Sequence, residues 1–247
     1  MTLGSKVAVI TGGGSGIGLA TAQLFHACGA RVAVLVRDPA RVDETARAIG
    51  ENSLVVAGDV RDVTSLRAFY RTVGQRWDRV DYVVANAGLA HPRPLTQCDE
   101  AYFDEMCGVN FRGVFFTVQS ALELLQDGGA VVLVSSAFHS KGASGFSVYG
   151  ATKSAVRALA RSMAAELAPR NIRVNCVSPG VTETPIFGKL GMDDAGLVAF
   201  RQFVRSITPL DRVSRPEETA KAILFLCTDA TFMTGADLVH DGGLSQV

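Results

Sequence analysis

Long apolar runs are missing from this sequence of 247 residues, and neither sign of charge predominates. A membrane-spanning helix needs roughly 20 consecutive apolar residues, and no segment approaches that length. The first residues also lack the layout of a secretory signal peptide. Because 24 basic residues balance 24 acidic ones and are spread along the chain, nothing indicates binding to nucleic acid or to a membrane surface. We therefore expect a cytoplasmic protein that acts on a small molecule.

Cysteine and histidine are too few and too scattered to form a metal site. The sequence has 5 cysteines and 4 histidines, with no CxxC pair and no cluster of His, Cys and Asp at ligand spacing. We expect reduced, mostly buried thiols and no metal. Surface exposure or local hydrogen bonding is the expected role of each histidine, with His139 lining a site as the less favoured alternative.

The sequence does contain a regular alternation of short β-branched runs and helical patterns. Hydrophobic residues make up 48% of it and charged residues 19%, which is typical of one well-packed domain. The predicted strands are 6–10, 31–36, 54–58, 82–85, 129–136, 171–178 and 236–240, and the predicted helices are 17–28, 39–49, one from about 62, 99–126, 148–170 and 216–228. This order predicts an α/β fold, a doubly wound and mostly parallel sheet with helices on both faces, in a single domain covering 1–247.

Two segments near the end of the chain complete this prediction. Residues 181–212 are less regular and contain at most two helical fragments. Ser214, followed at the third position by Glu217, has the spacing of a capping box for the last helix.

The chain from 129 to 167 carries the most informative pattern. A buried strand ends at Ser136, a loop rich in glycine and serine follows, and the next helix begins with Tyr149 and Lys153 on one face. An ammonium and the positive end of a helix both favour a phenolate, and they would lower a phenol pKa that is ordinarily about 10. The pattern predicts a site that moves a proton on and off an oxygen. A packed tyrosine beside a solvated lysine is the competing interpretation.

Glycines follow the first strand directly, in the run TGGGSGIG at 11–18. Gly12, Gly16 and Gly18 lie between a buried strand and a helix, where glycine lets backbone N–H groups approach a phosphate at the helix N-terminus. A tight turn without a ligand is the alternative, but the strand–glycine–helix context favours nucleotide binding. The spacing departs from GxGxxG, because three residues separate the first two glycines.

The end of the second strand bears on the choice of nucleotide. A dinucleotide-binding fold commonly places an acid there to hold the ribose 2′-hydroxyl, but this strand ends in Val36, followed by Arg37 and Asp38. An apolar residue and then an arginine favour a 2′-phosphate, and hence NADP(H). Asp38 as a ribose ligand keeps NAD(H) possible. An exposed pair that caps the helix 39–49 is a third interpretation.

Further candidate residues follow the next two strands. The side chain of Asp59, next to Val60, would meet an adenine edge or cap the helix near 62. The fourth strand ends in a run that suits the ligand crevice of an open α/β sheet: Asn86, Ala87 and Gly88. Asn110 has apolar neighbours, so its amide needs partners and its role is structural or functional.

Four motifs, in this order, resemble the short-chain dehydrogenase/reductase family in its compact single-domain branch. They are TGGGSGIG, Asn-Ala-Gly at 86–88, Ser136 with Tyr149-x-x-x-Lys153, and Ser-Pro-Gly at 178–180. The resemblance covers nearly the whole chain. It implies a Rossmann-type fold that binds NAD(P) and exchanges hydride between a carbonyl and an alcohol, and it implies a homotetramer.

The resemblance also assigns roles to residues. Tyr149 would be the general acid in reduction and the base in oxidation, with Ser136 hydrogen-bonded to the reacting oxygen. Lys153 would lower the tyrosine pKa and hold the nicotinamide ribose, and Asn110 would position a water that passes protons to solvent. Cofactor contacts would come from Gly12, Ser15, Gly16, Ile17, Gly18, Arg37, Asp59, Val60, Asn86, Ala87, Gly88, Tyr149, Lys153, Pro179, Gly180 and Thr184. One NADP-using subgroup has a basic residue in place of Ser15, so cofactor choice here rests on Arg37.

The expected function is the NADP(H)-dependent reduction of a ketone or oxidation of a secondary alcohol. Within 181–212, residues 183–205 are expected to cover the substrate. The apolar side chains of this segment are Ile186, Phe187, Leu190, Met192 and Phe200. Together with Phe138 and Phe146 and the lack of an Arg/Lys cluster, they predict an uncharged and fairly hydrophobic substrate. The alternatives are an NAD-dependent alcohol or diol dehydrogenase of the same family, a nucleotide-binding regulatory protein, and a sugar-nucleotide epimerase.

Overall fold

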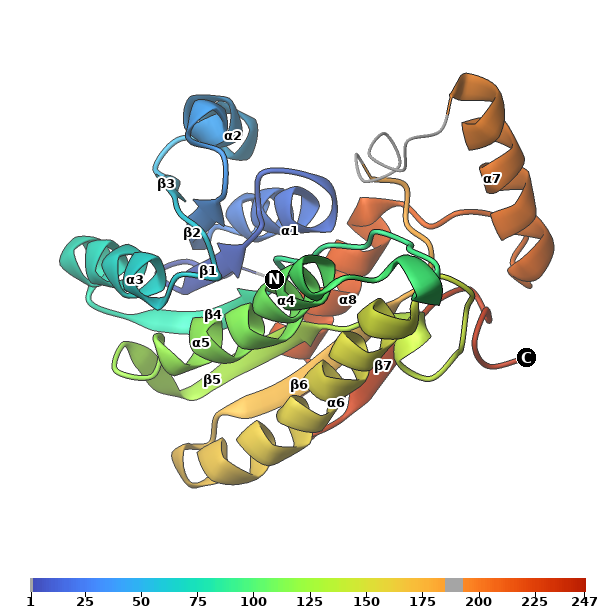
Figure 1. Ribbon diagram of the computed structural model, residues 1–247. Helices are drawn as coiled ribbons and strands as arrows, with labels where there is room; N and C mark the ends of the chain where they lie inside the picture. The colour runs from blue at the N-terminus through green and yellow to red at the C-terminus, as the bar shows by residue number, and fades with distance from the viewer. Residues whose placement is uncertain (1, 185–192) are drawn as a thin grey trace.

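The computed structural model describes residues 2–184 and 193–247, and its centre is a seven-stranded sheet in which every neighbouring pair is parallel (Figure 1). The strands are β1 (Val7–Thr11), β2 (Arg31–Val36), β3 (Leu54–Ala57), β4 (Val80–Ala85), β5 (Leu125–Val134), β6 (Arg173–Pro179) and β7 (Asp237–His240). Their order across the sheet is β3-β2-β1-β4-β5-β6-β7, so the direction of winding reverses between β1 and β4. The predicted doubly wound α/β fold in a single domain is confirmed.

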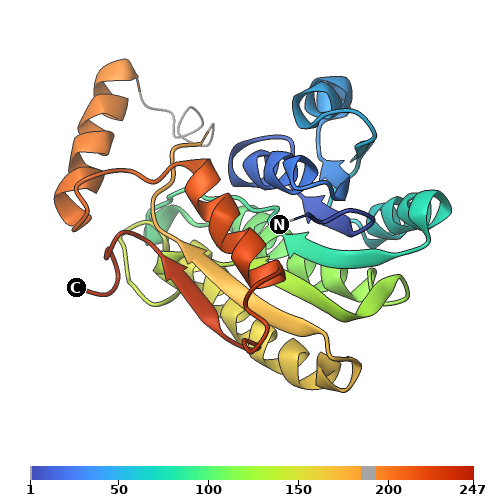
Figure 2. The same ribbon diagram turned by 180° about the vertical axis from the view of Figure 1, so that it is seen from behind.

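Helices cover both faces of this sheet (Figures 1 and 2). The helices of the described residues are α1 (Gly16–Ala27), α2 (Val42–Ile49), α3 (Val63–Trp77), α4 (Glu100–Cys107), α5 (Gly113–Gln119), α6 (Ser147–Leu167), α7 (Asp194–Ile207) and α8 (Pro216–Cys227). Helix α7 projects away from the sheet (Figure 1). Apolar residues of α3, α5 and α6 pack in one core, and those of α1, α2 and α8 pack in the other.

Most strand residues are apolar because both faces of the sheet are covered. In β1, Val7 and Val9 belong to the core under α3, α5 and α6, whereas Ala8 and Ile10 belong to the opposite core. Successive side chains of a strand point to opposite faces, so a strand between two helical layers buries every residue. All five residues of β1 are buried accordingly.

The predicted helix 99–126 is wrong in its second half. Helix α4 passes into a π-helical turn at Gly108–Arg112, α5 ends at Gln119, and β5 already begins at Leu125. Gly129, which was expected to start the strand, instead lies in a bulge within it, since the register with β4 shifts between Val80 and Tyr82. A Cβ on Gly129 would lie 2.7 Å from the carbonyl oxygen of Asp81, and only glycine permits that approach.

The predicted cap of the last helix is displaced by one residue. The N-cap of α8 is Arg215, whose N–H donates to Oε2 of Glu218 at 2.8 Å. Glu218 also pairs with Arg212 at 2.7 Å, and that hydrogen bond lowers the pKa of Glu218 to about 2. Ser214 and Glu217 therefore do not form the capping box, because Pro216 occupies the first helical position and sets where the helix begins.

The described part of the chain contains free cysteines and shows neither a metal-ligand cluster nor a membrane-spanning helix. All five cysteines are free, and burial raises the pKa of Cys176 and of Cys227 to about 12. Over 2–184 and 193–247, no cluster of His, Cys, Asp and Glu has the arrangement of a metal site. Within the same ranges no helix combines the length and apolarity needed to cross a bilayer.

Candidate functional site

A cavity of about 920 Å³ runs along the carboxyl ends of the strands. Residues that follow six different strands contribute to its wall: Gly12, Arg37, Gly58, Asn86, Ser136 and Gly180. An open α/β sheet binds its ligands in this position, beside the point where the strand order reverses. All predicted site residues line this cavity except Gly18 and Asn110.

The glycine loop after β1 is shaped by two close approaches. Gly12 has a φ of +67°, and a Cβ on it would lie 2.8 Å from Cα of Ala87; a Cβ on Gly18 would lie 2.4 Å from the carbonyl oxygen of Gly12. Gly18 thus packs α1 against the loop and does not face the cavity. The side chain of Ser15, the N-cap of α1, makes no capping hydrogen bond, and the first turn has no acidic residue. The N–H groups of this turn are therefore free to hold an anion.

Asn86 connects this loop to the end of β4. Its Nδ2 donates to the carbonyl oxygens of Thr11 at 3.0 Å and Gly12 at 3.2 Å, and its N–H donates to Oγ1 of Thr11 at 3.2 Å. The side chain is thereby committed to the protein itself, while Ala87 and Gly88 continue the cavity wall.

The carboxyl end of β2 presents two arginines and one carboxylate to the cavity. Val36 is buried, Arg37 and Asp38 are exposed, and Arg41 is half-buried. Asp38 Oδ1 accepts from the N–H of Ala40 at 3.0 Å and so caps the short 3₁₀ turn that follows. The capping interpretation therefore holds for Asp38. Arg41, a second cation on this wall, was missed because it lies inside the predicted helix 39–49.

Asp59 is held by Arg61 and does not cap a helix. Nε and Nη2 of Arg61 donate to Asp59 Oδ2 at 2.9 and 2.6 Å. The hydrogen bond from Arg61 is the main reason that the pKa of Asp59 is lowered, with a smaller contribution from the charge of Arg37. Asp62 caps α3 through the N–H of Thr64 at 2.8 Å. Capping by Asp59, one of the two sequence interpretations, is wrong.

Ser136 and Tyr149 form a hydroxyl pair on the cavity wall. Ser136 follows β5 and Tyr149 lies in the first turn of α6, and the Ser136 hydroxyl is close enough to lower the pKa of the phenol. The rings of Phe138 and Phe146 stack with centroids 4.9 Å apart, and both meet the tyrosine ring edge-on. The N–H of Phe138 also donates to Ser136 Oγ at 3.3 Å. The Ser136 hydroxyl is thus held by a hydrogen bond and the Tyr149 ring by packing before any ligand is bound.

The predicted lowering of the tyrosine pKa is wrong for the chain alone. Burial raises the pKa of Tyr149, and the hydrogen bond with Ser136 offsets only part of that effect. Lys153 Nζ donates to the carbonyl oxygen of Val134 at 2.8 Å and lies 5.8 Å from the centre of the Tyr149 ring. Burial lowers the pKa of Lys153 to about 8, since a low dielectric disfavours an ammonium. For the pKa of Tyr149, the desolvation of the phenol therefore outweighs the charge of Lys153, whose ammonium is directed at a backbone carbonyl.

Asn110 holds the loop after β4, which lines the cavity, through hydrogen bonds to Leu89. Its Oδ1 accepts from the N–H of Leu89 at 2.8 Å, and its Nδ2 donates to the carbonyl oxygen of Leu89 at 2.9 Å and to Oγ1 of Thr152 at 3.3 Å. Thr152 in turn donates to the carbonyl oxygen of Tyr149 at 2.7 Å. The amide joins the π-helical turn, the loop after β4 and the start of α6, which supports the structural alternative for this residue.

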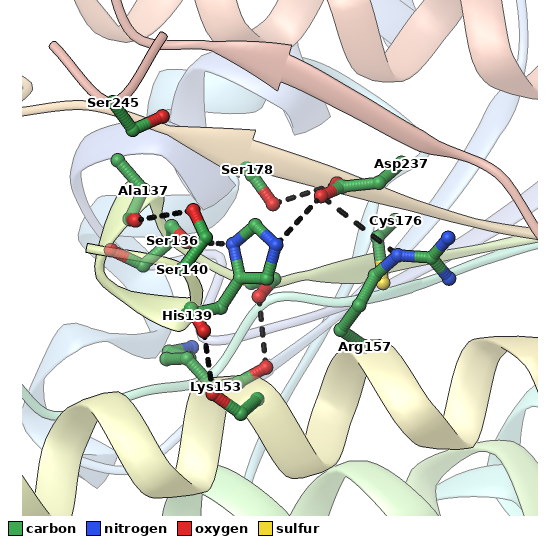
Figure 3. A network of polar contacts seen from close by, with 12 residues as sticks. Ser136, Ala137, His139, Ser140, Lys153, Arg157, Cys176, Ser178, Asp237 and Ser245 are labelled. Atoms are coloured by element: carbon green, nitrogen blue, oxygen red, sulfur yellow. Dashed lines mark hydrogen bonds and ion pairs between the residues drawn. The ribbon is translucent and has the colours of Figure 1, made fainter.

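Behind Ser136 lies a polar network that sequence reasoning missed (Figure 3). His139 Nδ1 lies 2.7 Å from the carbonyl oxygen of Ser136, and its Nε2 lies 3.2 Å from Asp237 Oδ2. Asp237 also accepts from Ser178 Oγ at 2.7 Å and faces Arg157 Nε at 3.9 Å. The network ties the loop after β5, strand β6 and helix α6 to the edge strand β7. The expectation of local hydrogen bonding for His139 is confirmed, and this residue does not line the cavity.

The end of the cavity beyond Tyr149 is largely apolar. Phe138 and Phe146 line it as expected, as does Phe200. The remaining predicted cover residues lie outside the described residues: Ile186, Phe187, Leu190 and Met192. Wall residues that the sequence did not single out come from α7, the loop after β5 and the C-terminal turn: Phe203, Val204, Ile207, Lys141 and Leu244.

Comparison with known proteins extends over nearly the whole chain. Residues 12–245 match the family model described as enoyl-(acyl carrier protein) reductase. The cis-4-hydroxycyclohexanecarboxylate dehydrogenase of Sinomonas cyclohexanicum is 40% identical, over 98% of this chain and 97% of the relative. A short-chain dehydrogenase/reductase structure of the glucose/ribitol dehydrogenase type from Brucella melitensis superposes with a TM-score of 0.93 at 31% identity, over 100% of both chains. A 3-ketoacyl-(acyl-carrier-protein) reductase from the same organism, solved with NADH, gives a TM-score of 0.89 at 33% identity, over 99% of this chain and 100% of that one.

Proposed function

The chain belongs to the short-chain dehydrogenase/reductase family of oxidoreductases, and from this membership and the cavity geometry we propose that it exchanges hydride between NADP(H) and a ketone or secondary alcohol. The observation that carries the proposal is that Ser136, Tyr149 and Lys153 line the same cavity as the glycine loop after β1. A proton donor and a dinucleotide site thereby face one space.

The roles proposed for these side chains follow from their contacts. In reduction Tyr149 donates its proton to the carbonyl oxygen, and in oxidation the phenolate takes it back. A raised pKa keeps the phenol protonated at neutral pH, which suits the acid role. Ser136 donates a hydrogen bond to the same oxygen. Lys153 is proposed to hold the nicotinamide ribose, and Asn110 positions the loop after β4 and the first turn of α6.

The wall fits a dinucleotide along its length. The uncapped first turn of α1 and the glycine loop, which an added Cβ would fill, suit the pyrophosphate. Asp59 and Val60 are placed for the adenine, and the residues proposed to contact the nicotinamide half are Asn86, Ala87, Gly88, Pro179, Gly180 and Thr184. When bound, the cofactor supplies or accepts the hydride.

The 2′-phosphate of NADP(H) is proposed to bind at Arg37, with Arg41 as a second cation. Two guanidinium groups beside the apolar Val36 favour a phosphate over a free hydroxyl. Asp38 is the residue through which NAD(H) would be accepted instead, since only its Oδ1 is engaged by Ala40.

The substrate proposed is a ketone or secondary alcohol with an apolar body. The rings of Phe138 and Phe146 and the side chains of α7 supply the wall beyond Tyr149, so 181–212 is proposed to cover the substrate. The name of the Sinomonas relative, which describes a ring-bound secondary alcohol, supports an alicyclic substrate.

We also propose a cytoplasmic homotetramer. Phe103 of α4 and Phe111 of the π-helical turn are 52% and 40% exposed in the isolated chain. Aromatic rings exposed on neighbouring turns are typical of a surface that a second copy covers, which supports an interface formed by α4, α5 and α6.

The test of the proposed function is turnover with both nicotinamide cofactors. Purified protein is assayed at 340 nm with NADPH and with NADH against a panel of alicyclic ketones, including cyclohexanone and 4-oxocyclohexanecarboxylate. We expect turnover with a higher kcat/KM for NADPH. Failure to turn over any panel ketone or the corresponding alcohols with either cofactor would contradict the proposal.

A further inference from the structure

We propose that Lys141 forms an anion subsite at the far end of the cavity and that the substrate is an apolar keto acid or hydroxy acid. The inference rests on the proposed function and adds a carboxylate to the substrate. The sequence predicted an uncharged substrate because no cluster of cations was evident. A single ammonium on the wall of a largely apolar cavity is sufficient to bind a carboxylate, since a charged hydrogen bond is stronger where water is excluded.

The position of Lys141 separates it from the adenosine end of the proposed cofactor site. It follows β5, and its backbone N–H donates to the carbonyl oxygen of Ala137, the residue after Ser136, at 3.2 Å. Arg37 follows β2, three strands away in the sheet, which corresponds to about 14 Å at a spacing of about 4.8 Å. Lys141 Nζ donates to the carbonyl oxygen of Leu244 in the turn after β7 at 2.6 Å. It therefore lies on the β7 side of Ser136, opposite the loops after β1, β2 and β3.

The charge of Lys141 has no carboxylate partner on this part of the wall. The described carboxylates that line the cavity are Asp38, Asp59 and Glu105. The first two follow β2 and β3, and Glu105 is close enough to Arg61 to influence its pKa, so all three lie towards the nucleotide end. The nearby Asp241 does not line this cavity, and its oxygens accept from the N–H groups of Gly243 and Ser245 at 2.9 and 2.8 Å.

The ammonium also retains hydrogen-bonding capacity. Nζ has three donors, and Leu244 accepts from one of them; no other partner of Nζ is found in 2–184 and 193–247. The rings of Phe138 and Phe146 line the same cavity and suit the hydrocarbon body of a ligand. An apolar body that ends in a carboxylate matches this combination.

The competing explanation is that Lys141 only tethers its loop to the C-terminal turn. A matched pair of substrates separates the two, because 4-oxocyclohexanecarboxylate and its methyl ester share the ring and the ketone and differ in charge. We expect wild-type protein to prefer the acid. Lys141→Met should lower the acid-to-ester ratio of kcat/KM by about tenfold to a hundredfold, the worth of a charged hydrogen bond, mainly through KM of the acid. Lys141→Arg should recover most of the ratio.

Lys221→Met, at an exposed lysine of α8, is the matched control and should leave the ratio unchanged. If wild type prefers the ester, or if Lys141→Met reduces acid and ester turnover by the same factor, the anion subsite is refuted while the proposed function stands. If wild type turns over neither compound nor any other panel ketone with either cofactor, both proposals fall.

Discussion

Tyr149→Phe removes one oxygen atom from the site and tests the catalytic assignment directly. The ring of Tyr149 meets Phe138 and Phe146 edge-on with centroids 6.3 and 5.7 Å apart, and phenylalanine keeps both contacts. Ser136 Oγ loses the phenol but still accepts the N–H of Phe138. The free energy of unfolding should therefore fall by only about 1 kcal/mol, the net worth of one hydrogen bond.

The effect on turnover should be far larger than the effect on stability. General acid–base help contributes about a hundredfold to ten-thousandfold, and the variant also loses a hydrogen bond to the reacting oxygen. We expect kcat to fall by at least about a thousandfold, or roughly 4 kcal/mol in the barrier. NADPH affinity should be nearly unchanged, because the nucleotide loops do not contact the phenol oxygen.

The assay combines steady-state turnover with fluorescence titration of NADPH and thermal unfolding. Tyr82→Phe is the matched control, since it removes a phenol oxygen from β4 at a buried position outside the cavity and should leave kcat intact. Retention of a tenth of wild-type turnover by Tyr149→Phe would show that another group donates the proton. An equal loss in the Tyr82→Phe control would show that the measured effect is structural.

Four further outcomes are expected. Arg37→Leu should weaken NADPH binding by about 1.5–3 kcal/mol and leave NADH binding nearly unchanged. The control Arg31→Leu, at the exposed start of β2, should change neither. A higher wild-type kcat/KM with NADH than with NADPH would instead favour Asp38 as the ribose ligand. In the cofactor-free protein, the difference in ultraviolet absorbance between wild type and Tyr149→Phe should show Tyr149 ionising above pH 10, because burial raises its pKa from the ordinary 10.0; ionisation below pH 9 would contradict the desolvation argument. Alcohol oxidation should nevertheless accelerate as pH rises, since only the phenolate accepts a proton. Light scattering at micromolar concentration should give the mass of a tetramer of the 26.1 kDa chain, and a monomer would contradict the proposed assembly.

Features set by local periodicity were predictable from the sequence. The strands were recognised because a strand buried on both faces is apolar at most of its positions, as β1 is from Val7 to Ile10. The common face of Tyr149 and Lys153 follows from helical geometry alone, and the glycine loop follows from the need for close backbone approach. Each of these arguments involves neighbours within a few residues along the chain.

Features that depend on distant contacts were decided only by the tertiary structure. No spacing rule connects His139 with Asp237 or Lys141 with Leu244, because each pair meets only when the loop after β5 packs against β7 and the turn that follows it. The π-helical turn at Gly108–Arg112 is followed by a close approach to Val60, which a Cβ on Gly113 would meet at 2.8 Å. The sign of the Tyr149 pKa shift reversed for the same reason. The sequence shows that a lysine is near in the helix, but only the folded chain determines how much water is removed from the phenol and that Lys153 donates to Val134 instead.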